Sequence, residues 1–291
     1  GVTVMLSGVR DFLELIKFEH TLFALPFAYL GMVLAARGWP SWRQVLWITI
    51  AMAAARTLAM GVNRLADRIY DARNPRTADR PLATGRMAPR TAWVGTSIAA
   101  LVLAVSAMAL GPLPLKLLPV ALLFLVGYAF TKRFTWASHF ILGFTDGLAP
   151  VGAWLAVRGS LFSADDLPAW ILLGAVTLWI GGFDLIYACQ DADFDRECGL
   201  HAIPARFGIP VALRLSGISH TITLVLLAVL GVILRLAWPY ALGLVLVTGL
   251  LILEHRLVSP GDLSRLDVAF FHINSLISLT LFGSVLAAVL T

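Results

Sequence analysis

The chain has 291 residues, of which 59% are hydrophobic and 13% charged, and its formal net charge is +5 at pH 7. Ordinary soluble domains carry about 25% charged residues, so this composition excludes a soluble enzyme and indicates a protein that lies in a lipid bilayer. No linker, low-complexity tract or polar block interrupts the chain, and we expect one domain over residues 1–291.

Long apolar runs along the chain predict transmembrane helices. A helix needs about 20 apolar residues to cross the hydrocarbon of a bilayer, and turn sequences such as "RGWPSW" and "GPLP" separate the runs. The predicted fold is therefore an all-α integral membrane bundle with nine transmembrane helices. We expect the spans at residues 12–36, 42–66, 91–111, 114–131, 136–157, 168–190, 209–234, 238–256 and 267–290.

Basic residues are distributed unevenly between the two ends of these spans. With nine spans, only five of the 22 basic residues lie at one end, and these are Arg37, Arg43, Lys116, Arg158 and Arg235. Because Lys and Arg accumulate in cytoplasmic loops, we expect the N-terminus and the charge-rich loops on the cytoplasmic side of a bacterial or archaeal membrane. The N-terminal stretch lacks the pattern of a removable signal peptide, so we expect the first span to direct insertion.

The first acidic cluster ends the second span. Asn63, Asp67 and Asp71 are spaced four residues apart, and four residues advance a helix by about 400°, so the three side chains drift by only about 40° per step. They predict one stripe of oxygen donors. Arg64 lies about 100° off that stripe, and residues 72–90 form a basic, Pro- and Gly-containing loop that we expect to cap the cluster.

The second acidic cluster ends the sixth span. Asp184, Asp191 and Asp195 are spaced seven and four residues apart, which predicts a second helical stripe with Tyr187 on the same side and Asp193 pointing away. Residues 196–208 follow as a second expected cap loop on the same side of the membrane.

The two stripes contain oxygen donors only, and such donors suit a hard cation such as Mg²⁺. Arginine is the side chain best suited to grip phosphate through two parallel hydrogen bonds. Acidic stripes, arginines and a membrane together predict a diphosphate on a lipid tail as the ligand. The alternative is that each cluster only anchors a helix end at the interface, although acids within membrane spans are functional by default.

At these residues the sequence resembles the UbiA superfamily of intramembrane prenyltransferases, the family of 4-hydroxybenzoate polyprenyltransferase. The family's N-x-x-x-D-x-x-x-D motif reads here Asn63, Asp67 and Asp71, and its D-x-x-x-D motif reads Asp191 and Asp195. The loop "NPRTADRPLATG" matches the family's cap loop, and the nine expected spans match its helix count. The stretches "IKFEHTLFALPFAYLG" and "TKRFTWASHFILG" are closer to a 4-hydroxybenzoate polyprenyltransferase-like branch, some members of which are thought to prenylate a dihydroxynaphthoate in menaquinone synthesis.

The resemblance implies Mg²⁺-dependent transfer of a polyprenyl group from a polyprenyl diphosphate to an aromatic phenolic acid, either 4-hydroxybenzoate in ubiquinone synthesis or a dihydroxynaphthoate. It implies catalytic roles for Asp184, Tyr187 and Asp191. Two or more Mg²⁺ ions would be held by Asn63, Asp67, Asp71, Asp191 and Asp195. Candidate diphosphate-binding residues are Lys17, Arg56, Arg64, Arg68, Lys132 and Arg133.

Several of these residues have a second interpretation. Each cation could instead extend its charge to the membrane interface. Asp184 could orient or deprotonate the phenol, steer the allylic cation, or only pair with an arginine. We expect hydrogen-bonding roles inside the bundle for His20, His139, His272 and Asn274.

Other classes of membrane protein remain as alternatives. A secondary transporter of an anionic or lipid-linked substrate is the main one, but both acidic clusters lie at one membrane face, whereas transporter sites lie near the midplane. A CDP-alcohol phosphotransferase would carry a D-G-x-x-A-R run, which the sequence lacks. We expect membrane lipid as the surroundings and no nucleic-acid partner.

Overall fold

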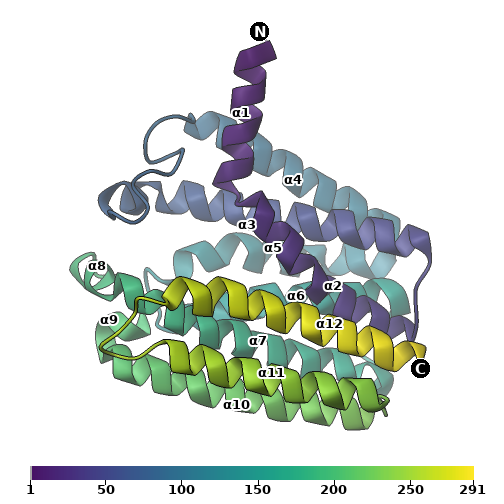
Figure 1. The fold of residues 1–291 in the computed structure, drawn as a ribbon. Coiled ribbons are helices and arrows are strands. Elements are labelled where there is room, and N and C mark those ends of the chain that lie inside the picture. The colour runs from purple at the N-terminus through teal and green to yellow at the C-terminus, as the bar shows by residue number, and fades with distance from the viewer. Residues whose placement is uncertain (1) are drawn as a thin grey trace. The chain divides into compact units, whose positions relative to one another are not determined.

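The computed structural model describes residues 2–291, apart from the side chains of residues 2–5, 19, 22 and 23, and these residues fold almost entirely into helices (Figure 1). Within them one isolated β-bridge pairs Ser259 with Asp262. The long helices are α1 (Val2–Leu15), α2 (Phe18–Ala36), α3 (Trp42–Arg73), α4 (Pro89–Leu110), α5 (Pro112–Thr131), α6 (Ser138–Arg158), α7 (Leu167–Ala188), α10 (Ile209–Ile233), α11 (Trp238–Leu257) and α12 (Asn274–Leu290). Shorter elements are η1 (Ala164–Asp166), η2 (Cys189–Asp191), α8 (Ala192–Glu197), α9 (Ile203–Phe207) and the π-helical η3 (Val268–Ile273).

Eight helical segments of the described chain are long and apolar enough to cross a membrane. They correspond to eight of the predicted spans, so the expected all-α membrane fold is confirmed. The remaining predicted span, 12–36, is wrong at its start, because α1 ends at Leu15 and α2 begins at Phe18. Lys17 between them has a backbone φ of 49°, a left-handed conformation that no α-helix can continue through. The apolar part of α2 is Ala24–Ala36.

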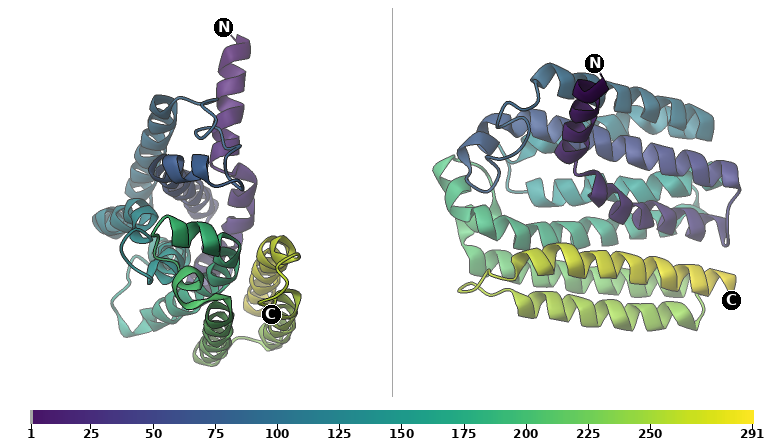
Figure 2. Two further views of the ribbon diagram at one scale, coloured as in Figure 1. Left: turned by 90° about the vertical axis from the view of Figure 1, so that its left-hand side faces the viewer. Right: turned by 45° about the horizontal axis from the view of Figure 1, so that its top comes forward.

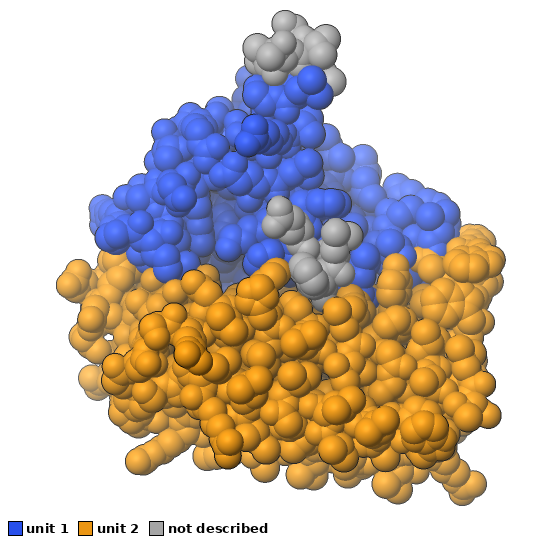
Figure 3. All heavy atoms as spheres, in the orientation of Figure 1, with its two compact units in different colours: residues 1–25, 46–130 blue, residues 26–45, 131–291 orange. Residues whose placement is uncertain are grey.

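The chain divides into two compact units, which Figure 3 distinguishes by colour. Unit 1 contains residues 1–25 and 46–130, and unit 2 contains residues 26–45 and 131–291. Each unit carries one of the two acidic clusters.

Small residues bring the helices of unit 1 together. Its main buried cluster joins α3, α4 and α5 through Ala54, Leu58, Val62, Ala99, Leu103, Leu125 and Ala129. A Cβ atom added at Gly61 of α3 would lie 2.1 Å from Oγ1 of Thr96 in α4, so these two helices are in close contact at that point. Helix association in lipid depends on such close packing, because lipid tails are as apolar as the side chains.

Unit 2 contains α6, α7, α10, α11 and α12, with α10, α11 and α12 running side by side (Figure 2). A Cβ atom added at Gly143 of α6 would lie 2.2 Å from the carbonyl oxygen of Thr177 in α7. Buried polar contacts add to this packing, since Trp179 donates from Nε1 to Oδ1 of Asn274 at 3.0 Å. The expectation that Asn274 bonds inside the bundle is thereby confirmed.

Candidate active site

The acidic stripe of unit 1 lies near the C-terminal end of α3. The Nδ2 atom of Asn63 lies 3.5 Å from Oδ2 of Asp67, one helical turn away. Asp67 and Asp71 are both buried, with relative exposures of 4% and 8%. The helix continues to Arg73, seven residues beyond the predicted end of the span at residue 66, so all three side chains belong to one regular helix. Their placement on one helical face agrees with the sequence prediction.

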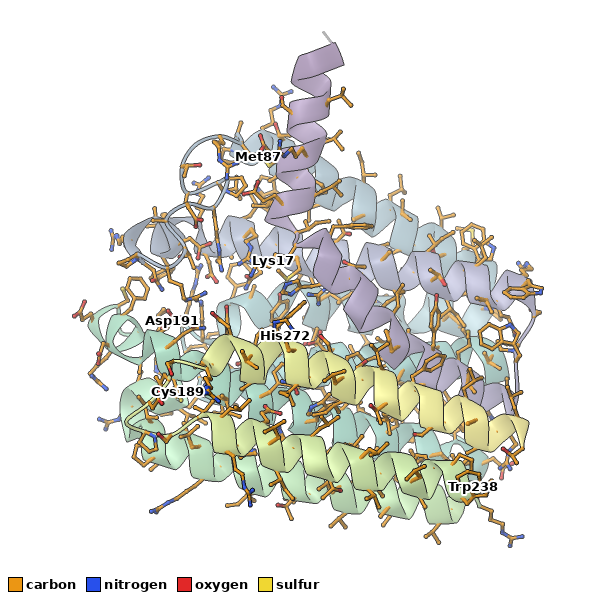
Figure 4. All side chains as sticks on the ribbon, viewed as in Figure 1. Lys17, Met87, Cys189, Asp191, Trp238 and His272 are labelled. Carbon is orange, nitrogen blue, oxygen red and sulfur yellow. The ribbon has the colours of Figure 1, made fainter. Side chains whose placement is uncertain are left out.

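Hydrogen bonds attach the loop after α3 to Asp71. Arg80 donates from Nη1 to Oδ1 of Asp71 at 2.7 Å, and the hydroxyl of Thr77 donates to the backbone carbonyl of Asp71 at 3.0 Å. The backbone N–H of Met87 (labelled in Figure 4) donates to the carbonyl of Pro81. Arg80 was not among the predicted site residues. No spacing rule relates it to Asp71, because the contact depends on how residues 74–88 turn.

Lys17 lies between α1 and α2 and outside the eight candidate spans (Figure 4). Burial, together with the positive charges of Arg64, Arg80, Arg76 and Arg56, lowers the pKa of Lys17 to about 8. A group of cations close enough to depress a lysine pKa is a favourable place for a multiply charged anion.

The predicted diphosphate-binding arginines of unit 1 differ in their surroundings. The Nε atom of Arg56 is buried without a hydrogen-bond acceptor in the described part of the chain. Arg64 is 6% exposed and donates from Nε to the last carbonyl of α1, at Leu15, at 3.2 Å, so part of this guanidinium caps a helix. Arg68 is exposed. Of the three, Arg56 is the best placed to receive an anion.

The acidic cluster of unit 2 is spread over three elements. Asp184 and Tyr187 lie on α7, Asp191 (Figure 4) ends the 3₁₀ turn η2, and Asp195 lies on α8. The predicted stripe through Asp184, Asp191 and Asp195 therefore does not run along one regular α-helix, because α7 ends at Ala188 and the chain tightens into a 3₁₀ turn. Asp193 is 90% exposed at its side chain and pairs with Arg196 at 2.8 Å, which confirms that it points away.

Contacts with neighbouring rings hold Tyr187 and Asp184 in place. Tyr187 stacks on Phe270, with ring centroids 4.0 Å apart and ring planes at 27°. Asp184 bonds through Oδ2 to Nδ1 of His139 at 2.7 Å. One alternative for Asp184 was that it pairs with an arginine; in the structure its partner is His139 instead. The expectation that His139 bonds inside the bundle is confirmed, although its partner could not be predicted from the sequence.

The segment between α5 and α6 carries the two predicted cations of unit 2. Lys132 is half-buried, and its backbone carbonyl accepts a 2.6 Å hydrogen bond from the N–H of His201. Arg133 is exposed. This contact holds Lys132 beside the segment that follows Asp195.

Metal coordination stays a prediction for both clusters. Within the described residues, no three His, Cys, Asp or Glu side chains come together as a possible metal centre. The donors of α3 are nevertheless all oxygens, two carboxylates and one amide, which is the donor set that Mg²⁺ accepts while it keeps positions for phosphate oxygens. The residues present therefore fit a magnesium ion that is completed by its substrate.

A sequence model of the UbiA prenyltransferase family matches residues 24–276 of the chain. The chain belongs to the UbiA prenyltransferase family. It is therefore an enzyme of prenyl transfer, and the transporter alternative is set aside.

Individual relatives and solved structures show which members of the UbiA family this chain is similar to. The 4-hydroxybenzoate octaprenyltransferase of Chromohalobacter salexigens is 32% identical over 272 residues, which cover 92% of this chain and 89% of the relative. The apo structure of a UbiA homolog from Aeropyrum pernix K1 has a TM-score of 0.84 at 31% identity and covers 92% of this chain and 98% of that one. A UbiA homolog from Archaeoglobus fulgidus, solved with GPP and Mg²⁺, shares the fold with a TM-score of 0.67 at 19% identity, over 97% of this chain and all of that one.

Proposed function

We propose that this UbiA prenyltransferase transfers a polyprenyl group from a polyprenyl diphosphate to an aromatic phenolic acid and releases diphosphate. The observation that carries the proposal is the similarity to a 4-hydroxybenzoate octaprenyltransferase along about nine-tenths of both chains. The acceptor is 4-hydroxybenzoate or, as the resemblance of the first span and of "TKRFTWASHFILG" to the second branch suggests, a dihydroxynaphthoate.

The predicted cations bind the diphosphate. Lys17 and Arg56 contact it, with Arg64 and Arg68 as further donors, and Lys132 and Arg133 are the remaining candidates. Support comes from the depressed pKa of Lys17 and from the buried Nε of Arg56. Positive charge at this point stabilises the negative charge that grows on the leaving oxygen as the C–O bond breaks.

Two or more Mg²⁺ ions, when bound, would neutralise charge on the diphosphate. The residues that would hold them are Asn63, Asp67, Asp71, Asp191 and Asp195. Arg80 holds one carboxylate oxygen of Asp71 at 2.7 Å, so Asp71 would offer its other oxygen or exchange Arg80 for the metal.

Bond formation follows ionisation. The diphosphate leaves with the bonding electron pair, an allylic cation remains, and an electron-rich ring carbon of the phenol attacks it. The ring then loses the proton from that carbon. We assign Asp184 and Tyr187 to orienting the phenol, because Asp184 keeps part of its side chain exposed, at 22%, and Tyr187 is held by stacking. The loops 72–90 and 196–208 act as caps that exclude water, which would otherwise capture the cation.

The topology that we propose has α2 as a ninth span and the active site on the cytoplasmic side. The apolar stretch Ala24–Ala36 is the hydrophobic part of that span. The excess of basic residues in the loops that follow the acidic clusters gives the orientation.

An acceptor panel tests the proposed function. The purified full chain is incubated in mild detergent with Mg²⁺ and a geranylgeranyl-length diphosphate, with 4-hydroxybenzoate in one reaction and a dihydroxynaphthoate in another. Mass spectrometry should find a prenylated product with one of them, and EDTA should abolish it until Mg²⁺ is restored. Absence of product with both acceptors, in a protein that remains folded, would contradict the proposal.

A further inference from the structure

His139 connects two elements of unit 2 that are far apart in the sequence. Its Nδ1 atom lies 2.7 Å from Oδ2 of Asp184 in α7, and its Nε2 atom lies 3.1 Å from the backbone nitrogen of Ile203 at the start of α9. The imidazole is 4% exposed. Both ring nitrogens are therefore engaged, one by a carboxylate of the second acidic cluster and one by the backbone of the segment that follows this cluster.

The two contacts define the tautomer of this imidazole. A backbone N–H can only donate, so Nε2 accepts from Ile203 and carries no proton. The hydrogen of a neutral imidazole then lies on Nδ1 and is donated to Asp184. Such an arrangement fixes the ring plane and holds one carboxylate oxygen of Asp184 in a defined direction.

The segment around Ile203 is attached at further points to the residues between the end of α5 and the start of α6. The N–H of His201 donates to the carbonyl of Lys132 at 2.6 Å, and the hydroxyl of Ser138 donates to the carbonyl of His201 at 3.2 Å. The ring of His201 lies 4.9 Å from that of Trp136. His139 also touches a candidate catalytic carboxylate, that of Asp184.

Asp184 is only partly enclosed by these contacts. Its side chain is 22% exposed, whereas that of His139 is 4% exposed. A carboxylate with one oxygen held by a buried imidazole and the rest of its side chain partly exposed is arranged to present the other oxygen to a ligand.

We propose that His139 is a positioning residue, which orients Asp184 toward the aromatic acceptor and couples this orientation to the seating of residues 199–207. The proposal rests on the proposed function, because it takes Asp184 as the group that meets the phenol. It adds a residue whose effect on catalysis passes through Asp184, and whose bond to the backbone of Ile203 links that orientation to the seating of residues 199–207.

A glutamine can reproduce both contacts, since its amide donates through nitrogen and accepts through oxygen, whereas a leucine of similar size can make neither. In the full chain with Mg²⁺, H139L should lower kcat about 10- to 100-fold. The KM for the prenyl diphosphate should stay within about threefold, and H139Q should recover most of kcat. Amide hydrogen exchange at Ile203 should accelerate in H139L and stay slow in H139Q.

A double variant separates positioning from general stability. If His139 acts through Asp184, H139L combined with D184N should be no slower than D184N alone. The matched control is His220, which is equally buried at 2% and bonds to His255 and to the carbonyl of Trp179. Any loss in H220L should multiply with that of D184N.

Two results would overturn the inference. One is a wild-type kcat in H139L, and the other is a loss in H139L that multiplies with that of D184N as the control does. If the wild-type chain forms no prenylated product, the proposed function itself fails. In that case amide hydrogen exchange at Ile203 still tests whether His139 holds residues 199–207 in place. Equal protection of this amide in H139L and H139Q would contradict that coupling.

Discussion

Single side chains in this protein serve either its fold or its chemistry, and Asp166 is a clear case of the first kind. It is completely buried, and its Oδ1 accepts from Nε1 of Trp154 at 2.9 Å and from Nε of Arg158 at 3.0 Å. Its Oδ2 accepts from the hydroxyls of Ser160 and Ser163 at 2.8 and 2.6 Å. This carboxylate therefore holds together the connection between α6 and α7 in unit 2.

Replacing Asp166 should destabilise the protein more than replacing its neighbour. D166A leaves several buried donors without an acceptor, which should lower the free energy of unfolding by about 3 kcal/mol. Asp165 is the matched control, because its side chain is 86% exposed and its ion pair with Arg158 is long, at 4.0 Å. D165A should therefore change the free energy of unfolding by less than about 0.5 kcal/mol. Thermal unfolding in detergent measures both. Equal midpoints would contradict the role of Asp166.

Lys17 gives a pH dependence to anion binding. Its pKa of about 8 means that the ligand-free side chain is charged below pH 8 and neutral above it. The affinity for the prenyl diphosphate should therefore fall as the pH rises from 7 to 9, and binding at pH 8 to 9 should be accompanied by proton uptake. K17R should lose this dependence, because arginine stays charged over the whole range. Calorimetric titration with a non-hydrolysable diphosphate analogue checks this, and identical pH profiles for both proteins would contradict it.

At the scale of elements, the loop after α3 is held by contacts of unequal strength. Arg80 pairs with Asp71 at 2.7 Å with both side chains mostly buried, at 18% and 11% exposure. Arg86 pairs with Glu14 at the same distance, but these side chains are 44% and 47% exposed, and exposed pairs contribute little. The Arg80 contact should therefore determine how residues 74–88 are seated.

Two variants compare these contacts. R80Q should accelerate amide exchange at Thr77 and at position 80 and expose the loop to limited proteolysis, since Asp71 loses its partner. R86Q should leave both measurements close to wild type. A loop that is equally protected in the two variants would show that other contacts hold it.

The helices themselves were largely predictable, and the breaks between them were not. Apolar length and turn residues predicted eight spans that the structure contains, because a bilayer requires such lengths. The break at Lys17 and the 3₁₀ turn at Cys189–Asp191 contain neither Pro nor Gly. They depend on tertiary packing of the flanking side chains, which no local pattern records.

At the scale of the whole molecule, each of the two compact units carries one acidic cluster. The four-residue spacing of Asn63, Asp67 and Asp71 was enough to predict their common face on α3. The contacts of Arg80 and His139 could not be predicted, because each joins residues that only the folded chain brings together: Asp71 with Arg80, and Asp184 with His139 and Ile203.

The central claim is that both acidic clusters are needed for cleavage of the prenyl diphosphate. The most direct measurement is diphosphate release by D67A, D191A and D193A in the full chain, with Mg²⁺, a prenyl diphosphate and the acceptor. Asp193 is the matched control, because it lies between Asp191 and Asp195 but points away and is exposed. D67A and D191A should each lose about 10²- to 10³-fold in kcat, while D193A keeps the wild-type rate. A wild-type rate in either D67A or D191A, or an equal loss in D193A, would contradict the account.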